Sequence, residues 1–244
     1  AMPCLNAAEV FTDTKPLKVG LVGCGGRGLG AMKNALDADP GTMVWALADV
    51  FQERIDFGAK LLAEQYGNRA QLDRSRLFSG LDSYKRLLQT DIDVVLLCTP
   101  PAFRPEHLAA AIDASKHIYA EKPVAVDVPG VLSVLESARL AKLKNLVILD
   151  GFCWRYDKAN EEAHRKLSSG LLGRVLSFDG LYYTTPPKSP LALDSRPSSD
   201  TDVAWALRNW TAWNWLSGGQ FVEQIVHTID GMVWSMNEQL PLSL

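Results

Sequence analysis

The sequence predicts an α/β fold, with an N-terminal doubly wound parallel sheet and a second part that begins where the pattern changes, close to residue 151. Short apolar strands alternate with amphipathic helical stretches from Leu17 to about residue 151, as successive βαβ units do. The first strand runs directly into the glycine-rich stretch "VGCGGRG" at 22–28, which is typical of a tight strand-to-helix turn. Together these features indicate a Rossmann-type sheet.

Each element follows from its own stretch of sequence. Strands are expected in the runs rich in Val, Leu and Ile: 17–23, 43–49, 93–98, 117–122 and 146–152. Helices are expected in the amphipathic stretches between them: 28–39, 52–66, 105–115 and 129–143. The rhythm then changes to a helix, a strand, a loop, a Trp-rich segment and a helix: 156–170, 174–185, 186–199, 205–215 and 219–236. We therefore expect three parts, namely an N-terminal arm, a Rossmann domain and a substrate or oligomerisation domain: 1–16, 17–151 and 152–244.

Composition excludes several classes of function. The 244 residues are 47% hydrophobic with a net charge of −3, which provides no basic footprint for nucleic acid. No apolar run approaches the length of a membrane span. The cysteines are widely spaced, which favours a reducing, cytoplasmic location: Cys4, Cys24, Cys98 and Cys153. An exported protein whose signal has been removed stays open as an alternative.

The first chemical motif is the glycine loop. Gly23, Gly25 and Gly28 match G-x-G-x-x-G between a strand and a helix, where the helix N-terminus attracts a pyrophosphate. Asp49 ends the second strand, at the position of a ribose-binding carboxylate. Its charge would oppose a 2′-phosphate, so we expect NAD rather than NADP. Arg54, nearby in sequence, is the one residue that favours NADP.

Two further motifs end later strands at the carboxyl edge of the sheet, where ligands bind. Thr99 and Pro100 begin a rigid loop, and His107 behind them is interpreted as a helix-start histidine with a local hydrogen bond. Glu121 and Lys122, in "AEKP", close the strand "HIYAEK". Taken alone, this stretch fits a surface turn with two solvated charges equally well. Lys122 beside a nicotinamide would donate to the oxygen that is oxidised or reduced and stabilise an alkoxide.

The fourth motif is "SGGQFVEQIVHTIDGMVW" at 217–234. Glu223 and His227 lie four residues apart on one helix face, among apolar neighbours, and Asp230 continues the same stripe. This pattern fits an acid/base pair better than a surface ion pair, and a metal site lacks a third ligand. We interpret His227 as the general base, Lys122 as its partner at the reacting oxygen and Glu223 as an orienting carboxylate. The reverse assignment, with Lys122 as the base, stays open.

Four stretches in this order resemble the glucose–fructose oxidoreductase/inositol dehydrogenase (Gfo/Idh/MocA) family: "GLVGCGGRG", "CTPPAFRPEHLAAAIDASKHIYAEKP", "GFCWRYDKANEEAHRKLSSGLLGRV" and "GGQFVEQIVHTIDGMVW". The resemblance implies an N-terminal Rossmann domain and a partial C-terminal α+β domain with an open sheet. It also implies hydride transfer between NAD(P) and a sugar or polyol, and a homo-oligomer, dimer or tetramer, when the chain is full length. It matches Lys122 to the family's active-site lysine and His227 to its catalytic histidine. Glu223 departs from the usual Asp. Family members are longer, so we expect this chain to be a partial one, with a new strand beginning at Leu240–Leu244.

The expected sites therefore form three groups. The catalytic group is Lys122, His227 and Glu223. The cofactor-binding group is Gly23, Gly25, Gly26, Arg27, Gly28, Asp49, Thr99, Pro100, Glu121 and Lys122. The substrate-binding candidates, for which structural packing is an equal alternative, are Trp154, Arg155, Tyr156, Asn209 and Trp210.

Three functions compete. The first is an NAD-dependent sugar or polyol dehydrogenase. The second is an NAD-dependent glycoside hydrolase, which oxidises a sugar carbon transiently, eliminates and returns the hydride. The third is a non-catalytic NAD-binding regulator, which the joint presence of Lys122, Glu223 and His227 argues against. We expect no metal in any of the three.

Overall fold

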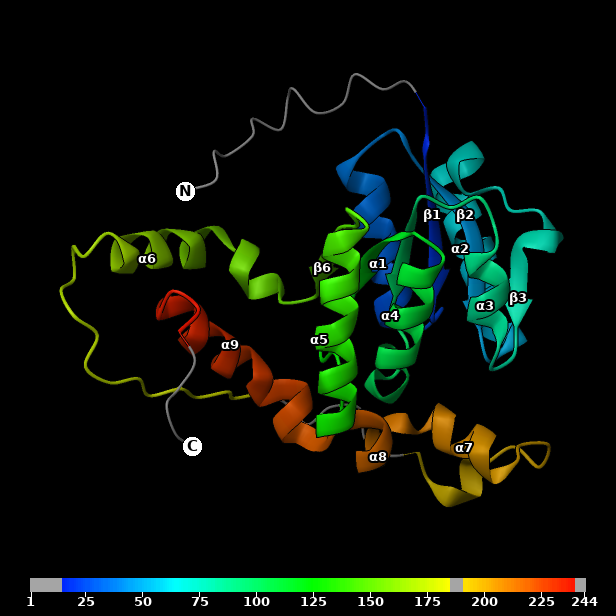
Figure 1. The fold of residues 1–244 in the computed structure, drawn as a ribbon. Helices are drawn as coiled ribbons and strands as arrows, with labels where there is room; N and C mark the ends of the chain where they lie inside the picture. The colour runs from blue at the N-terminus through cyan, green and yellow to red at the C-terminus, as the bar shows by residue number, and fades with distance from the viewer. Residues whose placement is uncertain (1–14, 185–190, 240–244) are drawn as a thin grey trace. The chain divides into compact units, whose positions relative to one another are not determined.

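A computed structural model describes residues 15–184 and 191–239 (Figure 1). It contains one six-stranded sheet with the order β3-β2-β1-β4-β5-β6. The strands are β1 Leu17–Val22, β2 Thr42–Asp49, β3 Leu77–Ser79, β4 Val94–Leu97, β5 His117–Ala120 and β6 Ile148–Asp150. β1 pairs in parallel with both β2 and β4, so the strand order reverses beside β1. This is the arrangement expected of a Rossmann sheet, and the prediction of a parallel doubly wound sheet is confirmed.

Helices connect the strands, as parallel pairing requires. They are α1 Gly26–Ala38, α2 Gln52–Tyr66, α3 Ser83–Leu88, α4 Arg104–Asp113 and α5 Val128–Leu143. All except α3 match a predicted helix within about two residues at each end. α3 and β3 were not predicted, because six and three residues carry too little periodicity to read.

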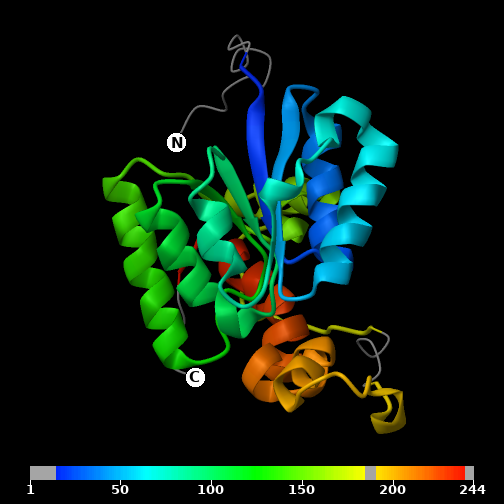
Figure 2. The ribbon, with the colours of Figure 1, turned by 90° about the vertical axis from the view of Figure 1, so that its right-hand side faces the viewer.

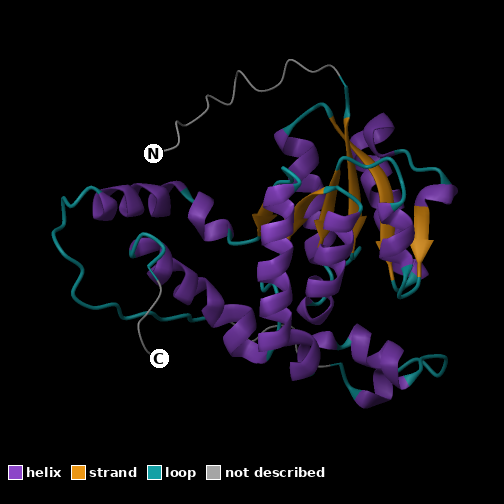
Figure 3. Ribbon diagram, viewed as in Figure 1, coloured by secondary structure: helices purple, strands orange, loops and turns teal. Residues whose placement is uncertain are grey.

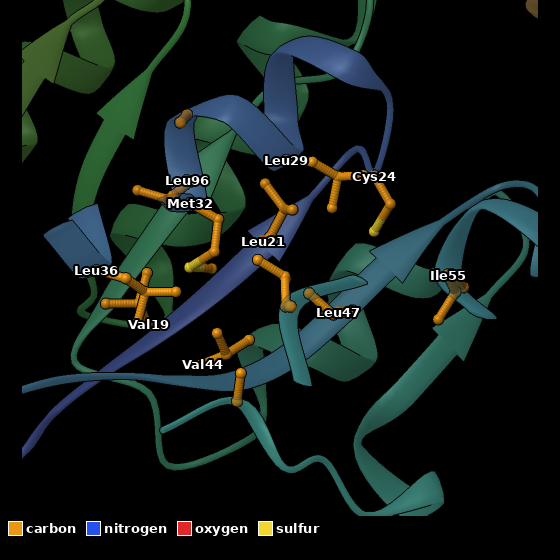
Figure 4. Packing of buried hydrophobic residues seen from close by; sticks show 13 residues of the cluster. Val19, Leu21, Cys24, Leu29, Met32, Leu36, Val44, Leu47, Ile55 and Leu96 are labelled. Atoms are coloured by element: carbon orange, nitrogen blue, oxygen red, sulfur yellow. The ribbon is translucent and has the colours of Figure 1, made fainter. Parts of the chain in front are cut away.

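The core on one side of the sheet lies between the strands and the pair α1 and α2 (Figure 2). Leu29, Met32 and Leu36 lie one helical turn apart on α1 and pack against Val19 and Leu21 of β1, as Figure 4 shows. These side chains are at most 5% exposed. The 3.6-residue period of α1 and the alternation of β1 therefore bury the same apolar set.

The opposite side of β1 is covered by α3. A Cβ atom on Gly20 would lie 2.9 Å from Leu87 Cδ2 of that helix and 3.0 Å from Ile92 Cδ1. Gly20 and Leu21 are adjacent in the strand and so face opposite sides of the sheet. Helices consequently cover both faces, which explains why the strands read as continuous apolar runs.

The chain divides into two compact units. The first contains the described residues up to Thr99 together with Ala110–Tyr119 and Lys144–Val147. The second contains Pro100–Ala109, Ala120–Leu143 and the described residues from Ile148 onward. The expected boundary near residue 151 stays a prediction. Within the described ranges, no helix is both long and apolar enough to cross a lipid bilayer.

The second unit contains the later helices: α6 Lys158–Ser168, α7 Asp202–Arg208, α8 Asn214–Ser217 and α9 Val226–Ser235. Asp157 caps α6 by accepting from the N–H groups of Ala159 and Asn160, and Thr201 caps α7 by accepting from Ala204. Side-chain oxygens at these positions satisfy main-chain donors that a helix start leaves open.

The strand predicted at 174–185 is wrong for the part that the structure describes. Residues 174–184 form an extended loop with no ladder partner in the described ranges (Figure 3). The aromatic and apolar residues of this stretch supply strand propensity, but a strand also needs a neighbour to bond. Thr185 and the strand expected at Leu240–Leu244 lie outside the described residues.

Candidate active site

The glycine loop leaves no room for side chains at two of its positions. Gly23 has a φ of 98°, and a Cβ there would lie 2.7 Å from the main-chain carbon of Cys98. A Cβ on Gly28 would lie 1.8 Å from the Gly23 carbonyl oxygen. Only glycine fits either position, because the first needs left-handed backbone and both have backbone as the obstacle.

The other two glycines of the loop face open space. No atom lies within 4 Å of a Cβ built on Gly25 or Gly26. Gly25 precedes α1, and no side chain of the described residues caps that helix start. Open N–H groups beside an unobstructed backbone are what a pyrophosphate needs, so this cradle fits the dinucleotide that the loop predicts.

Asp49 holds the glycine loop against β2. Its side chain accepts hydrogen bonds from the N–H of Cys24 at 2.7 Å and of Phe51 at 2.9 Å. Burial raises the pKa of Asp49, while these bonds and the charge of Arg54 oppose the rise. A carboxylate accepts about four hydrogen bonds, so the Asp49 side chain has capacity for a hydroxyl as well. The carboxylate is therefore fixed in direction, and its ribose contact stays a prediction.

Arg27 of helix α1 contacts strand β5. Its guanidinium donates to the Tyr119 hydroxyl of β5 at 2.9 Å.

Thr99 follows β4, and a Cβ on Gly23 would lie 2.9 Å from the main-chain nitrogen of Thr99. Pro100, in the second unit, precedes the short 3₁₀ turn Pro101–Phe103.

Lys122 and Glu223 meet in the second unit. The Lys122 ammonium donates to the main-chain carbonyl of Glu223 and lies 3.5 Å from Glu223 Oε2. Their side chains are 15% and 14% exposed. Burial raises the pKa of Glu223, and the charge of Lys122 opposes it. Glu223 Oε1 is buried without a hydrogen-bond partner in the described part of the chain, so it has one oxygen to offer a ligand.

The backbone that presents Glu223 is unusual. Phe221–Ile225 forms a π-helical turn that continues directly into α9. Such turns carry one residue more than an α-helical turn and concentrate at functional sites. Gly218 and Gly219 before it have φ values of 77° and 74°, which accommodate the sharp end of α8.

His227 is 7% exposed and lies among aromatic rings. Its imidazole stacks on the rings of Trp154 and Tyr182, with centroids 5.0 Å and 6.0 Å away. The Phe152 ring lies edge-on to it, with the centroids 6.0 Å apart. Burial lowers the pKa of His227, and the Lys122 charge lowers it further. The neutral imidazole is therefore favoured at pH 7, and this form accepts a proton.

Glu121 and Lys122 are fitted against the chain that leaves β6. A Cβ on Gly151 would lie 2.8 Å from both Glu121 Oε2 and the Lys122 main-chain nitrogen. Glu121 itself is 6% exposed, and the peptide bond from Lys122 to Pro123 is cis. The "AEKP" stretch is therefore a packed strand end and no solvated turn.

The five substrate-binding candidates differ in the residues that they contact. Trp154 touches His227, whereas the Arg155 guanidinium is committed to Asp230 and Glu238, each at 2.7 Å. Asn209 is buried and accepts from the N–H of Leu191. Two others lie in 3₁₀ turns without a described contact to His227: Tyr156 and Trp210. Their substrate roles stay predictions.

His107 lies in α4 and is buried. His107 is 5% exposed and stacks on Phe103 at 6.0 Å, in keeping with a local packing role. No group of three His, Cys, Asp or Glu side chains in residues 15–184 and 191–239 is arranged to hold a metal ion. Tyr182 is not among the candidates that the sequence predicts, because its stretch indicates only a strand.

The sequence of the first part of the chain decides the family. Residues 17–149 match the family model GFO_IDH_MocA, described as an oxidoreductase family with an NAD-binding Rossmann fold. The match covers more than half of the chain. The chain belongs to the Gfo/Idh/MocA family.

Among Gfo/Idh/MocA relatives, the dTDP-3,4-didehydro-2,6-dideoxy-alpha-D-glucose 3-reductase of Actinomadura kijaniata is 28% identical over 177 residues, which cover 72% of this chain and 48% of that protein. A glycosyl hydrolase family 109 protein of Streptomyces coelicolor is 32% identical over 175 residues, 70% of this chain and 35% of that protein.

A solved structure shares the fold. The scyllo-inositol dehydrogenase from Lactobacillus casei, with bound NAD(H) and scyllo-inositol, superposes with a TM-score of 0.64 at 22% identity. The superposition covers 91% of this chain and 56% of that one. The chain thus spans about half the length of the Gfo/Idh/MocA proteins that it matches. Its first part is an NAD-binding Rossmann fold, and the glycine loop and Asp49 lie within the matched residues.

Proposed function

We propose that the protein is an NAD-dependent oxidoreductase that transfers a hydride between nicotinamide and a hydroxyl-bearing carbon of a sugar or polyol. One observation carries the proposal: the Lys122 ammonium donates to Glu223, which lies four residues before the buried His227 in the turn that leads into α9. A lysine and a proton acceptor beside each other are what alcohol oxidation requires.

The cofactor's residues lie in the first unit. Gly25, Gly26 and the start of α1 would hold the pyrophosphate, and Asp49 would accept from the ribose hydroxyls. NAD, when bound, supplies the acceptor for the hydride. We propose NAD over NADP because the fixed Asp49 carboxylate would repel a 2′-phosphate.

The second unit supplies the proton chemistry. As the hydride leaves carbon, the hydroxyl proton must also leave, and neutral His227 takes it. The Lys122 ammonium donates to the same oxygen and stabilises its developing negative charge. Glu223 directs Lys122 through its carbonyl and carboxylate. The reverse assignment, in which Lys122 is the base and His227 positions substrate, is retained as the alternative.

A second function is favoured by one comparison. The glycosyl hydrolase family 109 relative is the more identical of the two curated relatives described above, at 32%. In a glycosidase of the oxidation and elimination type, the same base would act while the hydride returns to the sugar, so NAD would be regenerated in every cycle.

A parallel assay separates the two. Free sugars, polyols and aryl glycosides are incubated with the chain and NAD, while NADH absorbance and aglycone release are followed together. Net NADH with a free sugar or polyol supports the dehydrogenase. Aglycone release without net NADH supports the glycosidase. NAD binding with neither product over the whole panel would contradict both.

We also propose that the whole protein is a homo-oligomer, dimer or tetramer, in the cytoplasm. Exposed apolar side chains in the loop after α6 support an interface: Leu176, Leu181 and Tyr183 are 81%, 70% and 90% exposed. No disulfide joins the cysteines that the structure describes, which supports a reducing compartment. Light scattering of the whole protein tests the oligomeric state, and cell fractionation tests the cytoplasmic location.

A further inference from the structure

Arg155 joins the 3₁₀ turn Cys153–Tyr156 to helix α9 by a hydrogen-bonded ion pair. Its guanidinium donates from Nε and Nη2 to the two carboxylate oxygens of Asp230, at distances of 2.7, 2.9 and 3.1 Å. Its Nη1 donates to Glu238 at 2.7 Å. The Asp230 side chain is only 10% exposed. A planar guanidinium bonded in this way fixes the direction of the contact as well as its length.

The end of α9 is shaped so that Glu238 returns to Arg155. Asn237 and Glu238 have φ values of 53° and 63°, a left-handed conformation that few residues other than glycine adopt. Ser168 of α6 donates to the Asn237 side chain at 3.0 Å. The Arg155 guanidinium also lies over the Trp234 ring, 5.7 Å from its centroid. Arg155 therefore contacts α9 and the turn after it at several points.

The orientation of the His227 imidazole does not come from a hydrogen bond at Nδ1. That nitrogen is buried, and no residue in 15–184 or 191–239 bonds to it. A histidine base is often held in direction by a bond at its second nitrogen. Here the direction of the ring depends on α9 and on Trp154, against which it stacks. Arg155 follows Trp154 in the chain and binds Asp230, three residues after His227, so it connects both supports of the imidazole.

The same ion pair acts on the charge around His227. Four ionisable groups lie near the imidazole: Glu121 and Lys122 after β5, Asp230 on α9 and Tyr182 in the loop after α6. Burial and the Lys122 charge lower the pKa of His227, whereas the Asp230 and Glu121 charges raise it. Because Asp230 is bonded directly to the Arg155 guanidinium, the two opposite charges largely cancel for groups farther away.

We propose that Arg155 is a positioning residue for His227: it holds α9 against the turn that carries Trp154, and it compensates the Asp230 charge so that this charge does not act fully on the imidazole. The inference rests on the proposed function, in which His227 is the base. It gives Arg155 a role in supporting that base instead of contacting substrate.

Two substitutions that break the same ion pair leave opposite charges behind. Arg155→Met leaves the Asp230 carboxylate uncompensated and should raise the pKa of His227, whereas Asp230→Asn leaves the guanidinium and should lower it. A purely structural role would move the titration in the same direction in both variants. NMR titration of the His227 ring measures both shifts without substrate. Arg155→Lys restores the charge but not the planar fork, so it should return the titration toward that of the unchanged chain.

Arg165→Met is the matched control. The Arg165 guanidinium also lies 2.7 Å from a carboxylate, that of Glu162, but both groups are on α6, with side chains 68% and 47% exposed. This variant should leave the His227 titration unchanged. Urea unfolding identifies any variant that does not fold, and the other one still tests the proposal because each direction is predicted separately. A shift in the same direction for Arg155→Met and Asp230→Asn, or no shift in either, would overturn the positioning role.

Activity gives a second readout. With NAD and the substrate panel described above, Arg155→Met should lower kcat about tenfold to a hundredfold and leave KM within a few-fold, because a misplaced base weakens the transition state and not substrate binding. The acidic limb of the pH profile should move to higher pH in Arg155→Met and to lower pH in Asp230→Asn. A rise in KM at unchanged kcat would return Arg155 to substrate contact and overturn the proposal.

The two readouts separate this proposal from the proposed function. Opposite shifts of the His227 titration, without NADH formation by the unchanged chain on any substrate, would reject the oxidoreductase and keep the positioning role. NADH formation by the unchanged chain, with the same His227 titration in all variants, would reject the positioning role and keep the oxidoreductase.

Discussion

The ammonium group of Lys122 lies between two oxygens of one residue, the main-chain carbonyl and the carboxylate of Glu223, 101 positions later in the chain. A buried ammonium is stable only when such acceptors replace its water. This contact ties the "AEKP" stretch to the π-helical turn before α9. Because Lys122 donates to the main-chain carbonyl of Glu223, this contact does not depend on whether the side chain is Glu or the shorter Asp.

Replacing Lys122 tests its role at the reacting oxygen. Lys122→Met should bind NAD as before, because the glycine loop belongs to the other compact unit, and should lose about 10²–10⁴ in rate. Calorimetry and NADH formation measure the two effects. Lys158→Met, whose lysine side chain is 91% exposed, is the control. Normal turnover by Lys122→Met would reject this role.

Replacing His227 tests the base. His227→Ala should lose about 10²–10⁴ in kcat/KM and should also lose the acidic limb of the pH profile. In the unchanged chain the midpoint of the acidic limb should lie below about pH 6.5, because burial and the charge of Lys122 lower the pKa of His227. A variant that retains both its rate and its acidic limb would assign the base role to another group.

The pKa of His227 should respond to Lys122. Because the lysine charge lowers this pKa, Lys122→Met should raise it. NMR titration of the His227 ring measures the shift directly and needs no substrate. An unchanged titration would show that burial alone accounts for the lowered pKa.

The same histidine should make stability depend on pH. A pKa that is lower in the folded than in the unfolded state means that the unfolded chain binds the proton more readily. The contribution of neutral His227 to the free energy of unfolding is fully present above about pH 6.5. It is lost as the pH falls through the lowered pKa of His227. Urea unfolding should therefore show a smaller loss of stability on acidification for His227→Gln than for the unchanged chain. Parallel losses would contradict this linkage.

Asp49 should decide the choice of cofactor. Its fixed carboxylate predicts NAD binding at least about tenfold tighter than NADP binding, and Asp49→Asn should narrow the difference by removing the charge. Calorimetric titration of both cofactors is the measurement. Tighter binding of NADP by the unchanged chain would contradict the assignment and point to Arg54.

Two glycines of α1 should respond in opposite ways to the same substitution. Gly28→Ala places a Cβ 1.8 Å from the Gly23 carbonyl oxygen, so NAD affinity and melting temperature should both fall. Gly30→Ala meets no atom within 4 Å and should stabilise the chain by about 0.5–1 kcal/mol. Similar effects of both substitutions would refute the cradle geometry.

Much of the Rossmann sheet was predictable, because its information is local. The apolar run at 17–23 and the Val- and Leu-rich run at 93–98 became β1 and β4, since parallel strands buried on both faces need continuous apolar sequence. The stretch 174–185 shows the limit. Its side chains favour a strand, yet pairing depends on segments elsewhere in a chain, which no local pattern supplies.

The residues of the candidate site also differ in how far the sequence predicts them. Lys122, Glu223 and His227 could be singled out, because charged groups at a strand end or among apolar residues are costly unless used. Tyr182 could not, since an aromatic residue in an apolar stretch has the same appearance whether it packs or binds. What distinguishes it is Gly180, whose contact with Thr228 and Met232 exists only in three dimensions.

The π-helical turn at Phe221–Ile225 makes the chain unusually sensitive to length at one point. Deleting a single residue there would convert the turn to ordinary α-helix and change which main-chain carbonyl the turn presents outside the helix. The deletion keeps every charged group, yet it would carry the Glu223 carbonyl away from the Lys122 ammonium.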